Sequence, residues 1–561
     1  MVQKGQEKQF VFVGGPALTT KGDGIRSKLI QDGIREKKLQ RRRIAVAEMN
    51  KLIKERTYPE CICRLETNPL MRSRSIKAWE PSIEGPVADL LHCSFCSKYI
   101  RSRGPLLTGG SVQDIGSGHF DPMIPINGRI SQLRVREILS FATLHIFPNL
   151  RPLATAELYQ AWVFPFDDEL RLYAFLWSSK YQENVLRLTY SAPEDPAGMK
   201  EQHSLKGLTL GALHQEINTY TGQKQIDSII MCMLVLALNE TAGERIYRDQ
   251  SPFAPTFTGL HGLEIYGSRD PNPHHWKVMH ELLGKYGGLE SLRIFGLAWQ
   301  VSLADLTNAV HTLRKPLYPL VDVYGQLLEL DPPLVLFAPF GGGFSSTDGK
   351  LQTPGSGFKE LLSLDPPVYK QIVTVLSNVG ELSHVIHYMS MQPCGPRLLD
   401  LLADSRDLVH HRLFSLPDEN DAAGQILQLN HQSADNSPEQ SRELYLICRL
   451  AMHLYVTHVT FPVPRPAAVR GLLLQRLCPR LQAVSGQGVS SALLLWCVSV
   501  ALIASGGAEN FDEIWILFKK LCRDLNMTSL DTLLNTLRTF AWVDSAVQHH
   551  YTRITKDFFC G

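Results

Sequence analysis

The chain has 561 residues, of which 44% are hydrophobic and 20% charged, a composition that is typical of folded globular proteins and excludes collagen-like, fibrous and wholly disordered chains. Eleven cysteines are too few for a disulfide scaffold, and the first residues lack a secretory signal pattern, so we expect an intracellular protein with reduced thiols. The longest apolar run, Ala492 to Ala504, has 13 residues, fewer than the about 20 that cross a bilayer. We therefore expect a buried helix there and no membrane association.

The net charge of +2 conceals an uneven distribution of charged residues. Residues 1–110 hold 21 Lys and Arg against 11 Asp and Glu, whereas the remaining residues hold 36 against 44. The sequence therefore predicts a basic N-terminal arm, residues 1–57, ahead of a body with an acidic excess. The basic side chains that we assign to function in this arm are Arg35, Lys37, Lys38, Arg41, Arg42 and Arg43.

This basic run suits contact with DNA phosphates or recognition by a nuclear import receptor. The alternative interpretation is a solvated tail whose charge only maintains solubility. Residues 25–53 contain no proline and a single glycine, which favours a helix, but their apolar residues are too scattered to form a stripe. We expect the arm to be disordered or partly helical.

Residues 58–129 are rich in Gly, Pro and Ser and are predicted to form an irregular linker. Two cysteine pairs lie in this range, Cys61 with Cys63 and Cys93 with Cys96, and closely spaced thiolates can bind zinc. However, the first pair is Cys-x-Cys, and 29 residues separate the two pairs. We therefore expect unpaired structural thiols, with no metal and no cofactor.

From residue 130 onward the apolar spacing is helical, and alternating runs are scarce. This predicts that residues 130–561 form a large all-α regulatory body. Helices are expected at 131–147, 225–238, 276–283, 292–309, 367–389, 398–408, 441–459, 468–481, 491–504, 511–526 and 528–540. Stretches rich in glycine or polar residues predict mobile surface loops at 341–349, 354–357 and 417–438.

Motifs of common catalytic sites do not occur in the sequence. There is no Gly-x-Ser-x-Gly hydrolase elbow, no Gly-x-x-x-x-Gly-Lys-Ser/Thr phosphate loop and no His-Glu-x-x-His metal motif. We interpret His274, His275 and His280 as ordinary helix-start or surface histidines. We therefore expect that the protein is not an enzyme.

Several short motifs follow one another in a defined order. A Phe-Val-Phe-Val segment at residues 10–13 precedes the basic run, and a Gly-Ser-Gly-His-Phe-Asp-Pro element begins at Gly116. A histidine-containing helix ends in Gly-Gly-Leu at Leu289, and an aspartate, Asp305, follows an apolar stretch. The remaining motifs are Gly355-Ser-Gly-Phe358, Cys448-Arg-Leu-Ala451 and Leu493-Leu-Leu-Trp496.

In this order the motifs, over about residues 10–545, resemble a fungal-specific transcription factor family, the second fungal transcription factor domain class, in which many members lack a zinc binuclear cluster. The resemblance implies a nuclear transcriptional regulator, commonly of metabolic genes, whose partners are DNA, an import receptor and other regulators. Residues 1–110 hold four cysteines, whereas a binuclear cluster needs six. The alternative is therefore a nuclear scaffold or transcriptional cofactor that does not bind DNA. No sustained heptad pattern is visible, so the oligomeric state stays open.

Overall fold

The structure is a computed structural model, and it describes residues 90–92, 99–101 and 135–551. Within the last range the description omits residues 164–167, 190–195, 221–225, 240–248, 268–270, 341–352, 392–393, 430–437, 487–490 and 507–510. The chain divides into two compact units, residues 1–74 and 75–561, and every described residue belongs to the second. The predicted basic arm, the two cysteine pairs and the loop at 341–349 therefore lie outside the described residues.

The prediction of an all-α body is confirmed. In the described parts of residues 130–561 the regular elements are helices, and the extended pairings are two isolated bridges, Val321 with Leu327 and Val368 with Leu427. The predicted irregular linker contains one regular feature that we did not expect. Strands β1 (Leu90–His92) and β2 (Tyr99–Arg101) pair in antiparallel fashion there, with Leu91 opposite Ile100.

The first group of helices surrounds a core of aromatic and aliphatic side chains. Phe147 stacks on Phe175 with ring centroids 5.5 Å apart, and the edge of Trp162 meets the same phenylalanine. Helix α7 packs against both α8 and α9. The elements are α4 (Val135–Phe141), the π-helix η3 (Ala142–Ile146), α5 (Phe147–Leu150), η4 (Pro152–Ala154), α6 (Thr155–Val163), α7 (Glu169–Thr189), α8 (Pro196–Thr219) and α9 (Ile226–Asn239).

The middle elements depart from the predicted helix boundaries for local reasons. The helix predicted from residue 292 begins five residues later, because residues 289–291 form a separate turn and Gly296, with φ of +76°, caps the helix. The Asn272 side chain caps α11, and Gly287 in the left-handed conformation ends it. The elements are η5 (Leu260–Gly262), α10 (Leu263–Tyr266), α11 (Pro273–Tyr286), η6 (Leu289–Ser291) and α12 (Leu297–Thr312).

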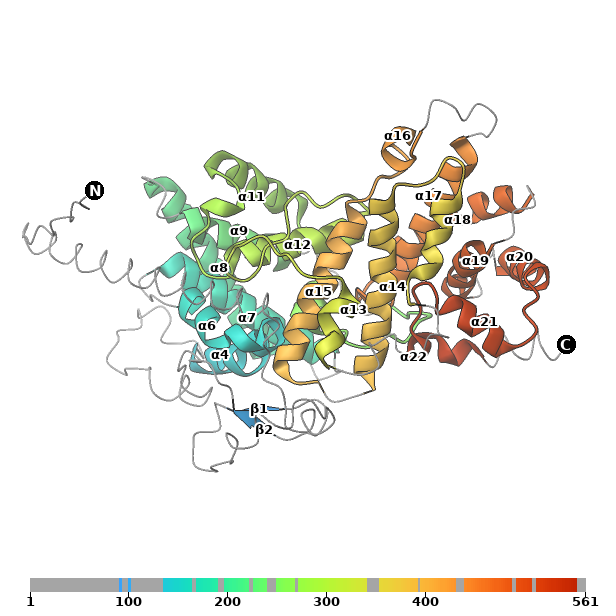
Figure 1. Ribbon diagram of the computed structural model, residues 1–561. Coiled ribbons are helices and arrows are strands. Elements are labelled where there is room, and N and C mark those ends of the chain that lie inside the picture. Colours follow the sequence, from blue (N-terminus) through green and yellow to red (C-terminus); the bar gives the residue numbers. More distant parts are fainter. Residues whose placement is uncertain are drawn as a thin grey trace, which may run out of the picture. The chain divides into compact units, whose positions relative to one another are not determined.

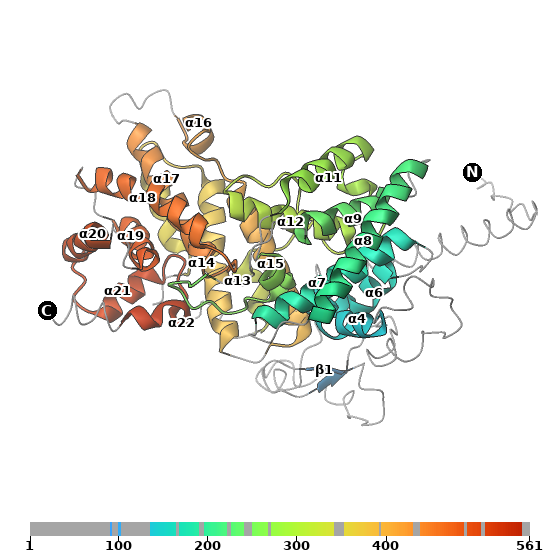
Figure 2. The same ribbon diagram turned by 180° about the vertical axis from the view of Figure 1, so that it is seen from behind.

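Later helices complete the body, and α14 and α15 lie between the early helices and the last ones (Figure 1, Figure 2). These elements are α13 (Pro333–Phe337), η7 (Ala338–Phe340), η9 (Ser356–Ser363), α14 (Lys370–Ser390), α15 (Pro396–Phe414), α16 (Ala423–Ile426), α17 (Pro438–Val456), α18 (Ala467–Gly486), α19 (Ala492–Ser505), α20 (Phe511–Asp524), α21 (Leu530–Leu537), α22 (Asp544–Val547) and η10 (Gln548–His550).

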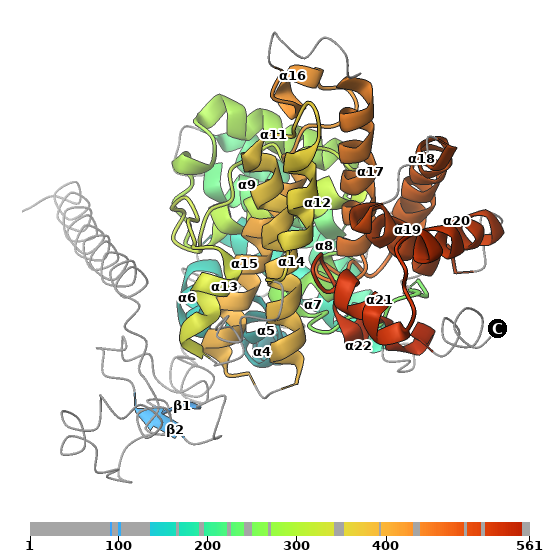
Figure 3. The ribbon, with the colours of Figure 1, turned by 45° about the vertical axis from the view of Figure 1, so that its right-hand side comes forward.

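Helix α19 is the buried helix that the longest apolar run predicts. It is buried along almost its whole length and packs against α17, α18, α20 and α21, which lie around it in Figure 3. Because it is enclosed by helices, apolar side chains are favourable on all of its faces. In the described part of the chain, no helix combines the length and apolar character that crossing a membrane requires.

The predicted surface loop at 354–357 is wrong, because its glycines pack in the core. Gly355 is buried with φ of +80°, and a Cβ there would collide with the backbone carbonyl of Ser377. On α14, Gly380 lies directly against Gly355, and a Cβ on Gly357 would come within 2.6 Å of the Phe540 ring. Glycine is needed at residue 355 because the backbone approaches its neighbours closely there, and not because the segment is a mobile loop.

Candidate functional site

Helix α15 carries three aspartates on one side, and all three are removed from solvent. Asp400, Asp404 and Asp407 are spaced by four and three residues, which places their side chains on one face. Their side-chain exposed fractions are 7%, 13% and 2%. This face packs against α12, η4 and η5. Buried carboxylates require positive or hydrogen-bonding partners, and the structure brings these from distant parts of the sequence.

Arg151 is the partner of Asp404. It follows α5 in an extended conformation, with φ of −156°, which turns the chain into η4. Its Nη1 and Nη2 donate to Asp404 Oδ1 and Oδ2 at 2.5 and 2.7 Å, a bidentate pair. The guanidinium also lies 5.6 Å from the centre of the Trp299 ring. Although burial opposes its charge, Asp404 and Asp400 raise the pKa of Arg151 above its ordinary value.

His261 connects Arg151 to the next aspartate. Its Nε2 lies 3.1 Å from Arg151 Nη1, and its Nδ1 lies 2.6 Å from Asp407 Oδ2. Because a guanidinium can only donate, Nε2 accepts, and Nδ1 carries the proton that is donated to Asp407. The ring also meets the edge of Trp299 at 5.1 Å. Three neighbouring side chains therefore fix the position of this imidazole.

Arg406 is the second buried cation, with 1% of its side chain exposed. Its Nε and Nη2 contact Asp407 Oδ1 at 2.8 and 2.7 Å, and Nη2 also donates to the Leu260 carbonyl. The guanidinium packs over the Phe461 ring at 4.8 Å. Burial opposes ionisation of Asp407, but Arg406 and His261 hold the pKa of this carboxyl below its ordinary value. Asp407 is therefore a fully partnered carboxylate.

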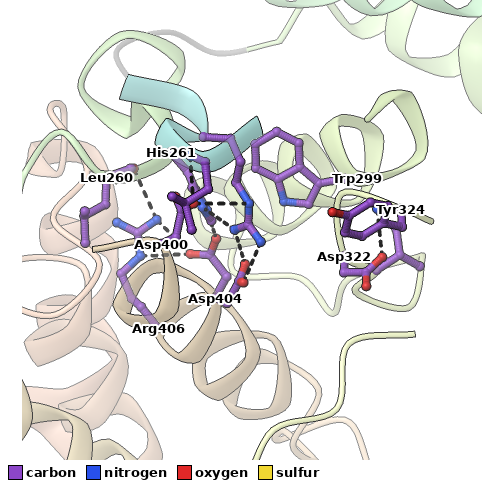
Figure 4. Close-up of polar contacts among 12 residues, drawn as sticks. Leu260, His261, Trp299, Asp322, Tyr324, Asp400, Asp404 and Arg406 are labelled. Carbon is purple, nitrogen blue, oxygen red and sulfur yellow. Dashed lines mark hydrogen bonds and ion pairs between the residues drawn. The ribbon is translucent and has the colours of Figure 1, made fainter. Parts of the chain in front are cut away.

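Asp400 is less well partnered than the other two aspartates. Its Oδ2 accepts from the Leu153 amide at 3.3 Å and lies 4.0 Å from Arg151 Nε. Its Oδ1 has no hydrogen-bond partner among the described residues. Burial raises the pKa of Asp400 to about 6, against the opposing effect of Arg151. Figure 4 shows Asp400, Asp404 and Arg406 converging near His261, with Trp299 beside them.

Asp322 adds further negative charge near these residues. Its Oδ1 accepts from the amides of Tyr324 and Gln326, each at 2.9 Å. Burial raises its pKa, and the charge of Asp404 acts in the same direction. The Arg151 cluster, defined here as Arg151, His261, Asp322, Asp400, Asp404, Arg406 and Asp407, thus contains four carboxyl groups and two guanidinium groups. Carboxylate charge is in excess.

A cleft of about 630 Å³ adjoins this cluster, and His261 and Asp400 form part of its wall. The other walls come from residues 145–152, 256–265 and 389–403. None of the described residues that line it is a lysine or an arginine. The polar side chains along the cleft, besides His261 and Asp400, are His145, Asn149, Thr256, Glu264, Ser390 and Cys394.

The segment between residues 256 and 262 has an unusual backbone. Phe257 and His261 have φ of 54° and 52°, values that side-chain-bearing residues rarely adopt, and Gly262 follows with φ of 68°. Such conformations cost about 1–3 kcal/mol each and persist only where surrounding contacts impose them. The bonds of His261 to Arg151 and Asp407 hold that residue in place. The buried charges therefore stabilise the unusual backbone of the cleft wall at His261.

Three of the sequence motifs contribute side chains to one buried core. The edge of Phe358 meets Trp496 at 5.2 Å and Phe540 at 5.1 Å, and Trp496 Nε1 donates to the Ala541 carbonyl. Cys448 forms a side-chain hydrogen bond with Cys497 in the same buried region. Residues from three motifs, separated by about 50 to 100 positions in the sequence, thus lie in one core.

Asp305 and the predicted histidines also have local structural contacts. Asp305 Oδ2 accepts from the amides of Leu317 and Tyr318 at 2.6 and 3.0 Å, and burial raises its pKa to about 6. His274 and His275 lie in the first turn of α11, and His280 Nδ1 lies 2.6 Å from the Tyr318 hydroxyl. His274 and His275 are helix-start residues, as predicted, whereas His280 lies in the middle of α11 and is half-buried between Trp276 and Tyr318.

The basic residues to which we assigned function from the sequence all precede the described part of the chain. Arg35, Lys37, Lys38, Arg41, Arg42 and Arg43 lie outside the described residues. Among the residues that are described, no three His, Cys, Asp or Glu side chains come together as metal ligands.

Sequence reasoning missed the Arg151 cluster entirely. A signal was present on α15, where aspartates recur at positions i, i+4 and i+7 among leucines. Such acidic residues suggest a solvated face, and nothing near them in the sequence identifies Arg151 or His261 as their partners. No protein-family model, curated protein sequence or solved structure matches the chain. A function must be inferred from the residues themselves.

Proposed function

We propose that this chain is a fungal transcriptional regulator. Its basic arm serves nuclear import, contact with DNA phosphates or both, and its all-α body binds a partner or an effector. The observation that carries the proposal is the ordered motif series, because Phe358, Cys448 and Trp496, which come from three of its motifs, lie in one buried core. The contacts among these motif residues support their assignment to one core, and the function rests on the resemblance of the ordered motifs alone.

The charge distribution supports a division of labour between the arm and the body. Residues 111–561 hold 44 acidic and 36 basic residues, so the body as a whole repels a polyanion such as DNA. Contact with phosphates is therefore a task for the arm. Phosphate contacts supply affinity without sequence information, which means that target choice needs a partner protein.

The test is a triple substitution, Arg41→Ala with Arg42→Ala and Arg43→Ala, in the full chain. We expect less nuclear accumulation of a fluorescent fusion and weaker binding to duplex DNA at low salt. For wild type, log K should fall with log salt by about 0.9 per neutralised phosphate. A matched control removes three exposed lysines of the body, Lys277, Lys285 and Lys370, and should change neither result. Unchanged localisation and unchanged DNA binding in the arm variant would contradict the proposal.

A second candidate is a nuclear scaffold or cofactor that does not contact DNA. The four cysteines in residues 1–110 favour it, since a binuclear zinc cluster needs six. Here the arm would act only as an import signal. Recovery of the full chain from nuclear extract, followed by sequencing of attached DNA, separates the two. For this comparison an import signal is added to the arm variant so that it reaches the nucleus. If the arm variant then recovers DNA as well as wild type does, the DNA is bound through a partner.

A further inference from the structure

We infer that the cleft beside the Arg151 cluster binds a small organic molecule with an apolar body and a protonated amine. The inference names the effector class of the proposed regulatory body, and it depends on the proposed function only for its regulatory meaning. Binding itself is a property of the cleft and can be measured on the purified chain.

The dimensions and the apolar part of the lining suit a small molecule. A volume of about 630 Å³ lies within the range of about 300–1,000 Å³ that small-molecule sites occupy. Apolar side chains come from three separate segments of the chain, among them Leu150, Phe257, Ile265, Met389 and Leu399. An apolar ligand body would therefore contact residues on several walls at once.

The charge of the cleft selects a cation. Asp400 and Glu264 line it, and the described lining contains no lysine or arginine. Asp400 has only a long ion pair with Arg151, whose Nε lies 4.0 Å from Oδ2, and its Oδ1 has no hydrogen bond among the described residues. Arg151 makes its bidentate contact with Asp404, and Arg406 contacts Asp407.

Asp400 is the specific group that a ligand amine would complement. It is 6% exposed, and its Oδ1 has no hydrogen-bond partner among the described residues. Arg151 compensates this buried carboxylate only at a distance of 4.0 Å, so a further positive charge nearby would stabilise it. An ammonium group in the cleft supplies that charge, whereas a carboxylate or phosphate would meet uncompensated negative charge.

The experiment compares isosteric probes on the purified full chain by calorimetry and thermal shift. The probes are phenethylamine, 2-phenylethanol and phenylacetate, together with hexylamine, hexanol and hexanoate. We expect saturable binding and stabilisation with the amines, at least tenfold weaker binding of the alcohols, and no binding of the acids. Equal binding of all three classes, or binding of none, would overturn the inference.

Two variants locate the site. Asp400→Asn keeps the shape of the side chain and removes its charge, and it should weaken amine binding at least tenfold. Ser390→Phe fills the cleft without changing its charge and should also abolish binding, while Ser204→Phe, on the exposed side of α8, should not. Amine binding that survives both cleft variants would place the site elsewhere. If the amines bind as expected but the localisation test of the proposed function fails, the cleft is still a binding site. Only the proposed regulatory function is then refuted.

Discussion

Arg151, at the end of α5, binds both carboxylate oxygens of Asp404, a residue 253 positions later in the chain. The pair is almost fully removed from solvent, with side-chain exposed fractions of 10% and 13%. It joins the first helices of the body to α15 beside the cleft. Because the two residues are charged and buried, losing either one removes the main compensating charge of the other.

The first prediction concerns this pair. Asp404→Leu should lower the free energy of unfolding by about 3–5 kcal/mol, because Arg151 would keep its charge in a buried position without its main partner. Chemical denaturation of the full chain measures the effect. Glu281→Leu is the matched control, since Glu281 is 64% exposed and lies 3.8 Å from Lys277, and it should cost less than about 1 kcal/mol.

A rescue experiment separates lost charge pairing from lost shape. Adding Arg151→Met to Asp404→Leu removes the uncompensated cation and should recover part of the lost stability. If the double variant is as unstable as the sum of the two single variants, the pair does not act through its charges.

The second prediction concerns the contact between two glycines. Gly380→Ala should destabilise the body by about 1–3 kcal/mol, because a Cβ there would lie 2.5 Å from Gly355 Cα and neither backbone can yield easily. Gly211→Ala, on an exposed face of α8 with open space around it, should instead raise stability by up to about 1 kcal/mol. Thermal unfolding shows whether the melting temperature falls for Gly380→Ala and rises for Gly211→Ala. Similar shifts for the two variants would contradict the close contact.

The third prediction is a loss of stability in mild acid. Burial lowers the pKa of His458 to about 3, whereas the unfolded chain has an ordinary value of about 6.5. Above pH 6.5 both states hold a neutral ring. As the pH falls below 6.5 only the unfolded state takes up the proton, so His458 should cost about 2 kcal/mol of stability between pH 7 and 5.

Other groups oppose this trend, so a difference measurement is needed. Burial raises the pKa values of Asp305 and Asp400 to about 6, and as the pH falls below 6 they protonate first in the folded state, which stabilises it. We therefore compare wild type with His458→Asn by denaturation at pH 7 and pH 5. The difference in the free energy of unfolding between wild type and His458→Asn should fall by about 2 kcal/mol, in disfavour of wild type, from pH 7 to pH 5. Parallel behaviour of the two proteins would show that His458 does not titrate as described.

The fourth prediction is that the cysteine pairs do not hold zinc. Cys93→Ser with Cys96→Ser should leave the helical circular dichroism and the melting temperature unchanged, because a structural zinc site needs four ligands and contributes strongly to folding. Elemental analysis of the purified chain measures the metal directly. One zinc per chain in wild type that is lost in the double variant would contradict the prediction.

Helices with regular apolar spacing could be predicted from the sequence, among them α15 with its buried aspartates, whereas α7 could not. Residues 491–504 were predicted as a buried helix, and α19 spans Ala492–Ser505. Helix α7 was missed because buried polar residues interrupt its pattern. Lys180, for example, is 2% exposed and contacts Glu183 at 2.8 Å and Glu201 at 3.5 Å. The sequence of α7 alone does not reveal the Glu201 partner, which lies on α8.

The same limit explains why the cleft could not be foreseen. Its acidic wall depends on pairings between residues more than 100 positions apart, such as His261 with Asp407 and Arg151 with Asp404. Local spacing identifies the face of α15 that carries the aspartates. Only the tertiary structure shows that two arginines pair closely with Asp404 and Asp407, whereas Asp400 has one long ion pair.

The separation of Arg151 from Asp404 has a consequence for synthesis on the ribosome. At roughly 5–20 residues per second, Asp404 is translated more than roughly ten seconds after Arg151. Throughout this interval the nascent chain lacks the carboxylates that permit the guanidinium to be buried. The end of α5 and the turn into η4 can therefore reach their final packing only once α15 has emerged, so nascent chains that end before Pro396 should remain open to proteases and chaperones at this segment.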